Sequence, residues 1–235
     1  MSAATVIDLG DDALRLVVEI ESGSVPEPSA ELDTRWGELA ARNPRLFNGR
    51  ILAFLHADLA STRLRVRVDE YKRMAAQSRD DPRLTQFGVT GVLTATDDSA
   101  RPCVLLGRRS AATHIHPGRW ELAPSGGVDA PEPGITRLSV TQICAQLERE
   151  LAEETGVTID GLTPTPIALC HDPDAPSMDV IFRLELGTMP SEHKATWEYD
   201  QLVWVPINRL RDELDIRSID LIAPSAAVLR WLGWM

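Results

Sequence analysis

The feature that most constrains this chain is a helix that the sequence predicts from Ser139 to Gly156. Ser139 is a favourable N-cap residue with Gln142 three positions later, and Gly156 can end the helix in a left-handed cap. No glycine or proline interrupts the segment. Its apolar residues recur at helical spacing on one face, which comprises Val140, Ile143, Cys144, Leu147 and Leu151. We therefore expect this stripe to pack against the core of a domain.

Three glutamates lie on or near that stripe. Glu150, Glu153 and Glu154 stand at positions i, i+3 and i+4, where like charges repel one another on a helix. Glu154 falls within the stripe and Glu150 at its edge. A buried carboxylate normally protonates, pairs with a base or coordinates a cation, and clustered oxygen ligands suit Mg²⁺ or Mn²⁺. For Glu-x-x-Glu-Glu alone, the alternative is a solvated acidic face of the helix.

The residues around the three glutamates favour cation binding over a solvated acidic face. The run Arg149-Glu-Leu-Ala-Glu-Glu-Thr-Gly-Val157, preceded by Gly126 and Gly127, resembles the Nudix box, the signature of the Nudix hydrolases. The second half of the box is complete. The first half departs from the family pattern, because the loop that follows the two glycines carries extra residues. The early glutamate of the pattern falls on Thr141 when counted back from Arg149. When counted forward from Gly127, it falls near Glu132.

The resemblance covers roughly residues 86–215 and implies an α/β fold of the Nudix type, an α/β/α sandwich on a mixed sheet. It also implies catalytic carboxylates that bind Mg²⁺ or Mn²⁺. Glycines next to the box would let a backbone carbonyl reach the metal. The implied metal ligands are Glu150, Glu153, Glu154 and a carbonyl of Gly126 or Gly127.

Arginines are candidates for two further roles. By the resemblance, Arg149 would be the catalytic residue that orients Glu150 and the loop, and an ordinary ion pair with Glu153 on the helix face is the alternative. Arginines outside the box could bind substrate phosphate, because a guanidinium grips phosphate oxygens at two points. These candidates are Arg108, Arg109 and Arg119, each of which could also be a surface residue.

Other polar residues remain open. Many Nudix proteins add an acid from outside the box, and the sequence does not choose among Asp172, Asp174, Asp179, Glu198 and Asp200. His114 and His116 fall in an expected loop before Pro117. A His-x-His pair without other ligands does not make a zinc site, so a solvated loop is the alternative.

Residues 1–85 form a segment that a minimal Nudix domain lacks. Patterning predicts a small α+β unit with a strand over 14–20, a helix over 29–42, strands over 51–57 and 64–68, and a helix over 70–76. The turn-rich stretch 78–82 is the expected boundary. The strand over 64–68 alternates apolar residues with arginine, so one of its faces must be buried. We therefore expect an extension of residues 1–85 that docks on a catalytic domain of residues 86–235.

The run Asn43-Pro-Arg-Leu-Phe-Asn-Gly49, with Trp36 upstream, resembles the N-terminal extension of Nudix proteins that hydrolyse UDP-sugars. The alternative is that Trp36 and Phe47 simply form the core of the unit. The resemblance favours a UDP-sugar, cleaved to UMP and a sugar 1-phosphate. Other nucleoside diphosphate derivatives remain as alternatives, namely ADP-ribose, dinucleoside polyphosphates and coenzyme A derivatives.

Two alternatives belong to other functional classes. A Nudix-like sensor binds a nucleotide sugar without cutting it, and loss of the box acids would favour that, whereas all three are present here. An isopentenyl diphosphate isomerase uses a related fold but needs a catalytic cysteine, and Cys103 lies in an expected buried strand. The resemblance therefore favours an enzyme that hydrolyses a small-molecule nucleoside diphosphate derivative.

Composition limits the partners. The 235 residues carry a net charge of −11, and no run of lysine or arginine suggests a nucleic-acid footprint. No stretch is long and apolar enough to span a membrane, and the N-terminus lacks a leader pattern. Three cysteines flanked by apolar residues, Cys103, Cys144 and Cys170, are expected to be reduced core thiols. We expect a cytoplasmic protein without nucleic-acid or membrane partners, and the sequence leaves a homo-oligomer open.

Overall fold

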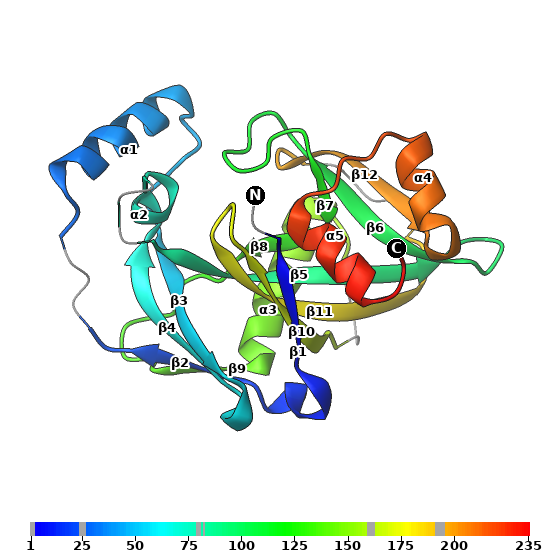
Figure 1. Cartoon of the computed structure of the whole chain (residues 1–235), viewed down its shortest axis with the longest axis horizontal. Coiled ribbons are helices and arrows are strands. Elements are labelled where there is room, and N and C mark those ends of the chain that lie inside the picture. The colour runs from blue at the N-terminus through cyan, green and yellow to red at the C-terminus, as the bar shows by residue number, and fades with distance from the viewer. Residues whose placement is uncertain (1–2, 24–26, 79–80, 82, 159–162, 191–195) are drawn as a thin grey trace.

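The computed structural model describes residues 3–23, 27–78, 81, 83–158, 163–190 and 196–235. Within them, twelve strands join in one mixed sheet (Figure 1). The strands are β1 (Thr5–Asp8), β2 (Val17–Glu21), β3 (Arg50–Asp58), β4 (Arg63–Glu70), β5 (Thr85–Thr96), β6 (Pro102–Arg109), β7 (Trp120–Leu122), β8 (Ser125–Gly127), β9 (Arg137–Ser139), β10 (Thr165–Asp172), β11 (Ser177–Thr188) and β12 (Tyr199–Pro206). The α-helices are α1 (Ala30–Arg42), α2 (Tyr71–Ala75), α3 (Val140–Thr155), α4 (Leu210–Ile216) and α5 (Ala223–Trp231).

The sheet is covered on both faces, as the resemblance implied. Side chains alternate across a strand, so neighbours on β11 face opposite layers. Val180 and Phe182 share a buried cluster with Leu147 of α3. Ile181, between them, shares a second cluster with Val228 of α5. Helix α3 therefore covers one face, and α4 and α5 cover the other, which confirms the α/β/α sandwich (Figure 1).

Strand β5 organises the centre of the sheet. It runs parallel to β11 along one edge. Along its other edge it pairs in turn with β3, β8 and β6, all antiparallel. The short strand β8, which carries Gly126 and Gly127, is therefore held at the middle of β5. This arrangement fixes the backbone of the two glycines beneath α3.

Helix α3 forms as the sequence predicts. Ser139 and Gln142 make a reciprocal capping box, and Gly156 ends the helix in the left-handed conformation with φ of 72°. Its N–H donates to the carbonyl of Ala152 at 3.1 Å. The helix buries its predicted apolar face together with Glu154. A carboxyl group is thus carried into the protein by the packing of the stripe around it.

Strands from residues 1–85 continue the same sheet. β1 pairs with β10, β3 pairs with β5, and β2 pairs with β4 and with β9, which immediately precedes α3. Leu64 and Val66 of β4 share one buried cluster with Leu138 and Leu147. We propose on these contacts that residues 1–85 are an integral part of the catalytic fold.

One expected strand is wrong in its bounds. The sequence predicted a strand over 14–20, whereas the structure has a 3₁₀ helix, Gly10–Arg15, followed by β2. The turn starts at Gly10, whose φ of 60° suits glycine and whose N–H donates to Asp8 Oδ1 at 2.8 Å. Leu14 is consequently 66% exposed instead of facing the core.

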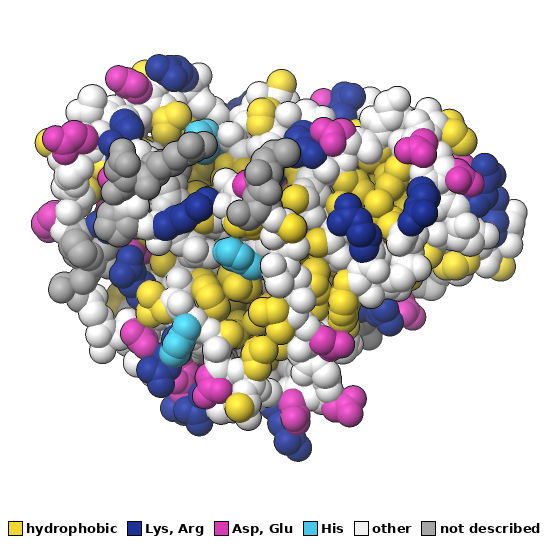
Figure 2. Space-filling view, in the orientation of Figure 1, with side chains coloured by type: hydrophobic (Ala, Val, Ile, Leu, Met, Phe, Trp, Pro, Cys, Tyr) yellow, Lys and Arg dark blue, Asp and Glu magenta, His cyan; other side chains and the backbone are white. Residues whose placement is uncertain are grey.

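Cys103, Cys144 and Cys170 are buried and unpaired. In the described parts of the chain, no helix has the length and apolar character needed to cross a bilayer. On the face shown in Figure 2, basic side chains are interspersed with acidic ones.

Two leucine substitutions test the proposed integration. Leu64→Ala removes a side chain that is 0% exposed and should lower the free energy of unfolding by about 2–5 kcal/mol. Leu14→Ala is the matched control and should change it by less than about 0.5 kcal/mol. We expect Leu64→Ala to weaken amide-exchange protection in α3 as well, because Leu64 and the apolar face of α3 belong to one hydrophobic cluster. Unchanged protection in α3, with a separate unfolding step for residues 1–85, would contradict integration.

Candidate active site

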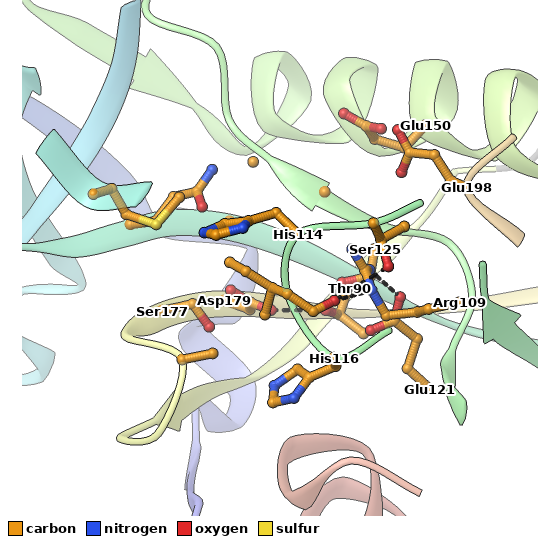
Figure 3. Close-up of a pocket in the computed structure, with 18 of the residues that line it drawn as sticks. Thr90, Arg109, His114, His116, Glu121, Ser125, Glu150, Ser177, Asp179 and Glu198 are labelled. Atoms are coloured by element: carbon orange, nitrogen blue, oxygen red, sulfur yellow. Dashed lines mark hydrogen bonds and ion pairs between the residues drawn. The ribbon is translucent and has the colours of Figure 1, made fainter. Parts of the chain in front are cut away.

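A cavity of about 430 Å³ lies where the N-terminal unit meets β5, β8, β11 and α3 (Figure 3). Its wall includes the loop after α1, the loop between β6 and β7, and the loop before β12. Several polar side chains from distant parts of the sequence face it. They include Thr90, Arg109, His114, His116, Glu121, Ser125, Glu150, Ser177, Asp179 and Glu198.

One end of the cavity is formed by α3 against β8. Glu150 lines the cavity, and a Cβ atom added to Gly126 would lie 2.4 Å from the Glu150 carboxyl carbon. A larger residue at this position would displace the Glu150 carboxyl group from the place it occupies against β8. Behind it, Glu154 is 2% exposed and accepts the N–H of Ser125 at 3.0 Å. The two glutamates, one turn apart on α3, thus both approach the backbone of β8.

Glu153 is placed differently. It lies one residue from Glu154, which is about 100° around the helix. It is exposed and is not among the residues that line the cavity. Of the three predicted acids, the structure therefore brings Glu150 and Glu154 to β8 and leaves Glu153 on the outer side of α3.

Arg149 reaches Glu150 through an intermediate. Arg149 Nη2 donates to Gln146 Oε1 at 2.7 Å, and Gln146 Nε2 donates to Glu150 Oε1 at 2.6 Å. Arg149 Nη1 is also paired with Asp129 at 2.9 Å. The chain of bonds fixes the amide of Gln146 and with it one oxygen of Glu150. Asp129, two residues after the glycines, thus supplies the carboxylate that pairs with Arg149.

The early glutamate of the box is not found at either predicted position. Thr141 lies in the first turn of α3, and Glu132 lies in the preceding loop; both are exposed and outside the cavity lining. Glu132 lies in the longer loop before β9. Because β9 pairs with β2, this loop runs along the N-terminal strands, and Glu132 stays outside the cavity.

Among the three predicted arginines, Arg109 reaches the cavity. Its Nη1 is 2.6 Å from Glu121 Oε1, and its Nε donates to the carbonyl of Ile115 at 2.8 Å. The hydroxyl of Tyr199 donates to the same Glu121 oxygen at 2.7 Å. Arg109 is thus held in a fixed orientation by a buried carboxylate and a backbone carbonyl.

The structure does not bring Arg108 or Arg119 into the cavity lining. Arg108 makes two hydrogen bonds to Asp200, at 2.6 and 2.9 Å. Arg119 makes two to Asp220, both at 2.9 Å, and a third to the carbonyl of Leu221. Both guanidinium groups are therefore engaged on the protein surface.

The five candidate acids outside the box differ in whether they line the cavity. Glu198 lines the cavity beside Glu150 (Figure 3). Asp172 and Asp179 line another part of it, whereas Asp174 is exposed outside the lining and Asp200 is paired with Arg108. Glu198 is therefore the acid that joins the box glutamates.

The two histidines also line the cavity, so the solvated loop is not what the structure has. His116 Nε2 lies 3.3 Å from Asp172 Oδ2, and His114 Nε2 lies 3.3 Å from the carbonyl of Ala75 in α2. The loop between β6 and β7 is thus anchored both to β10 and to the N-terminal unit.

A hydrogen-bonded group of polar side chains forms the floor of the cavity. Thr90 Oγ1 donates to Asp179 Oδ2 at 2.9 Å and lies 3.0 Å from Ser125 Oγ. Since the Ser125 N–H binds Glu154, the floor and the acid end meet at this one residue of β8.

Comparison with known families decides the identity. Residues 85–224, more than half of the chain, match the family described as NUDIX domain. The chain belongs to the NUDIX domain family. It is a Nudix hydrolase, an enzyme that acts on pyrophosphate bonds. A comparison with curated protein sequences gives no match.

Solved structures of modest similarity include other Nudix proteins. A MutT protein from Methanosarcina mazei is 20% identical, with 66% of this chain and 96% of that chain covered and a TM-score of 0.47. An Ap4A hydrolase from C. elegans is 19% identical, with coverage of 63% and 96% and a TM-score of 0.44. The NUDIX domain of Shewanella oneidensis NrtR, complexed with ADP ribose, is 19% identical, with coverage of 68% and 93% and a TM-score of 0.44.

The box carboxyl groups of this Nudix hydrolase are strongly perturbed. Burial, followed by the charges of Glu198 and Glu150, raises the pKa of Glu154 well above its usual range. Burial also raises the pKa of Glu150 to about 7, although its hydrogen bond from Gln146 acts in the opposite direction. Glu150 and Glu154 therefore resist ionising together.

The donor set fits a divalent cation. Glu154 Oε1 is buried without a hydrogen-bond partner, and a cation would compensate the charges of Glu150, Glu154 and Glu198. Among the described residues, no three His, Cys, Asp or Glu side chains are already grouped closely enough to hold a metal ion. Small side-chain rotations of Glu150 and Glu198, both at the cavity wall, would have to complete the site.

Several residues of the site were not singled out from the sequence. Gln146 stands one helical turn before Glu150, a spacing at which a hydrogen bond is expected, so this signal was present. Glu121 and Thr90 carried no such signal. Both lie in strands that otherwise read as apolar core, and only the pairing of β5, β6, β7 and β8 brings them to the cavity.

The pKa of Asp179 gives a prediction about stability. Burial raises this pKa to about 7, while hydrogen bonds from Thr90 and Ser177 oppose the rise. Asp179 ionises near pH 4 in the unfolded chain, so the folded state loses stability as the pH rises from about 4 to about 7. The side chain introduced by Asp179→Asn cannot ionise. We expect the melting temperature of this variant to rise relative to wild type across this window in EDTA, and then to stay level.

Asp174→Asn, an exposed carboxylate in the turn before β11, is the matched control for loss of one charge. Thermal unfolding at several pH values measures the difference for each variant. A constant difference between wild type and Asp179→Asn from pH 4 to pH 8 would show that the folded environment does not disfavour the charged carboxylate.

Proposed function

We propose that this Nudix hydrolase cleaves the diphosphate linkage of a UDP-sugar to give UMP and a sugar 1-phosphate, with Mg²⁺ or Mn²⁺ as cofactor. The observation that carries the proposal is that one cavity joins Glu150 of the box and the neighbouring Glu198 to the loop over residues 43–49. The acid end suits a metal-bound diphosphate, and the loop belongs to the segment that resembles UDP-sugar hydrolases.

The metal would be held by Glu150, Glu154 and Glu198, with a backbone carbonyl of Gly126 or Gly127. Glu153 stays in the proposed set because of its place in the box, although its side chain is exposed. When bound, such an ion neutralises phosphate charge and makes a bound water a better nucleophile.

The protein's own groups have separate roles in this proposal. Glu198 has a second role besides holding the metal: it lines the cavity beside Glu150, so its carboxylate can accept a proton from the attacking water. Arg149 acts through Gln146 to hold Glu150 in orientation. Arg109 is the arginine assigned to the substrate phosphate, because it faces the cavity and Glu121 fixes its direction.

The rim of the cavity offers a surface for a base. Phe47 is 75% exposed although it lines the cavity. Arg45 lies 5.4 Å from the ring centre of Trp197, which is 51% exposed. Asn43 Nδ2 holds this loop to the carbonyl of Ala112 at 2.9 Å. Exposed rings at a cavity mouth suit a planar base, which binds by stacking.

Metal dependence is the first test. EDTA should abolish turnover and Mg²⁺ should restore it. Glu154→Gln should lower kcat by roughly 10²-fold or more, because the metal loses a ligand. It should unfold in EDTA at a temperature no lower than wild type, since the substitution relieves like-charge repulsion. The rise in melting temperature on adding Mg²⁺ should shrink.

Glu148→Gln is the control, because Glu148 is exposed on the same helix. It should keep wild-type activity and the full response to Mg²⁺. Full turnover in metal-free buffer would contradict the metal assignment, and joint loss of fold and activity in Glu154→Gln would make that residue structural.

A product assay tests the substrate. We expect UMP and a sugar 1-phosphate from UDP-glucose or UDP-galactose, measured by chromatography of the products. ADP-ribose, dinucleoside polyphosphates and coenzyme A derivatives should be cleaved with lower kcat/KM. Efficient cleavage of one of these compounds, without UMP from any UDP-sugar, would reject the UDP-sugar proposal and keep the Nudix chemistry.

A further inference from the structure

The floor of the cavity is a polar patch on an otherwise apolar sheet face. β5 and β11 run parallel, with Ser177 opposite Gln86, Asp179 opposite Gly88 and Ile181 opposite Thr90. Alternate residues of a strand face the same side, so these six positions share one face. All six line the cavity. Further along the same face, Ile181 belongs to the core beneath α5, so the polar patch begins where this core ends.

Asp179 is the acidic member of this patch and is held in place. The Thr90 hydroxyl donates to its Oδ2 at 2.9 Å, and Ser177 also hydrogen-bonds its carboxyl group. A carboxylate has about four acceptor positions. Two hydroxyl donors therefore leave it able to accept further hydrogen bonds from a ligand.

Gly88 leaves the Asp179 carboxyl accessible. A Cβ atom on Gly88 would lie 2.5 Å from Asp179 Oδ1 and 3.0 Å from the carbonyl of Gly126. Any larger residue would cover the carboxyl group and crowd β8. A glycine in the middle of a buried strand weakens the strand, so its presence here is consistent with a close approach by another group.

The floor lies next to the acid end but is separate from it. Ser125 links the two, because its N–H binds Glu154 and its Oγ lies 3.0 Å from Thr90. After burial, the charges that most raise the pKa of Asp179 are those of Glu121 and Asp172. Neither Glu150 nor Glu154 is among its principal neighbours. Asp179 is thus placed beside the reacting groups without belonging to their cluster.

We propose that Asp179, positioned by Thr90 and Ser177, binds hydroxyl groups of the substrate and determines specificity for a sugar. This inference rests on the proposed function, which places a diphosphate at the acid end and therefore puts an adjoining sugar over the floor. A carboxylate is the acceptor that sugar hydroxyls bind most strongly, through charge-assisted hydrogen bonds. A site built to bind a hydroxyl discriminates against analogues that lack it.

Substrate analogues with single hydroxyls removed provide the test. Wild type, Asp179→Asn and the control Asp174→Asn are assayed with UDP-glucose, with each deoxyglucose analogue and with the 2′-deoxyuridine analogue. Asp179→Asn should lower kcat/KM for UDP-glucose by about 10- to 100-fold, mainly through KM. For one deoxyglucose analogue, wild type and Asp179→Asn should become nearly equal. Asp174→Asn should match wild type throughout.

The pattern of losses distinguishes the outcomes. Equalisation only with the 2′-deoxyuridine analogue would place the ribose over the floor and overturn the assignment to the terminal sugar. An equal loss with every analogue would mean that Asp179 does not contact a hydroxyl. A fall in kcat alone that depends on Mg²⁺ concentration would move Asp179 into the metal site.

A binding measurement separates this inference from the proposed function. Calorimetry with Mg²⁺ compares glucose 1-phosphate with inorganic phosphate as ligands. Wild type should bind glucose 1-phosphate more tightly, and Asp179→Asn should lose most of this preference. If no UDP-sugar is cleaved but the preference depends on Asp179, the UDP-sugar proposal fails and the hydroxyl site stands. If UDP-sugars are cleaved but Asp179→Asn keeps the preference, the hydroxyl site is wrong.

Discussion

The structure depends on the burial of carboxyl groups between α3 and β8. Glu154 is almost fully enclosed and holds the backbone of Ser125, and the Glu150 carboxyl group packs directly on Gly126, where the glycine leaves it room. Such a cluster is unfavourable alone, since burial and mutual repulsion both oppose ionisation. Three features of the surrounding fold keep the acids in place: the capped helix α3, the strand β8 with its two glycines, and the hydrogen bonds from Arg149 through Gln146 to Glu150. Together these features hold the carboxyl oxygen atoms of Glu150 and Glu154 in fixed positions, where the proposed cation would bind.

The sheet explains how the rest of the cavity is assembled around these acids. β5 pairs with β8, β3 and β11, so it links the glycines, the N-terminal unit and Asp179. The loop between β6 and β7 completes the wall, since His116 contacts Asp172 and His114 contacts the end of α2. The cavity thus has an acid end, a polar floor and an aromatic rim, each built from a different part of the chain. The chemistry of the box is common to the family, whereas we propose that the floor and the rim determine the choice of substrate.

Residues 1–85 add strands to the sheet of the Nudix domain and do not only pack against it. Their strands extend the sheet, and β2 pairs with β9 in the long loop before α3. This pairing gives the extra residues of that loop a structural role and explains why neither Thr141 nor Glu132 takes the place of the early glutamate. Asp129, close to β8 and bridged to Ile51 of β3, is the carboxylate that pairs with Arg149.

The sequence by itself determined the family, the sandwich, the bounds of α3 and the acids at its end, because capping, apolar period and a contiguous motif are local properties of the chain. It also restricted the external acid to five candidates that included Glu198. Only the tertiary structure shows which of these candidates line the cavity. It also shows that Arg108 and Arg119 lie outside the cavity and that Asp179 lies on its floor. These outcomes depend on which strands become neighbours and on which charges find partners, such as Asp200 for Arg108 and Asp220 for Arg119. Such pairings join residues that lie about a hundred positions apart, and no local pattern encodes them.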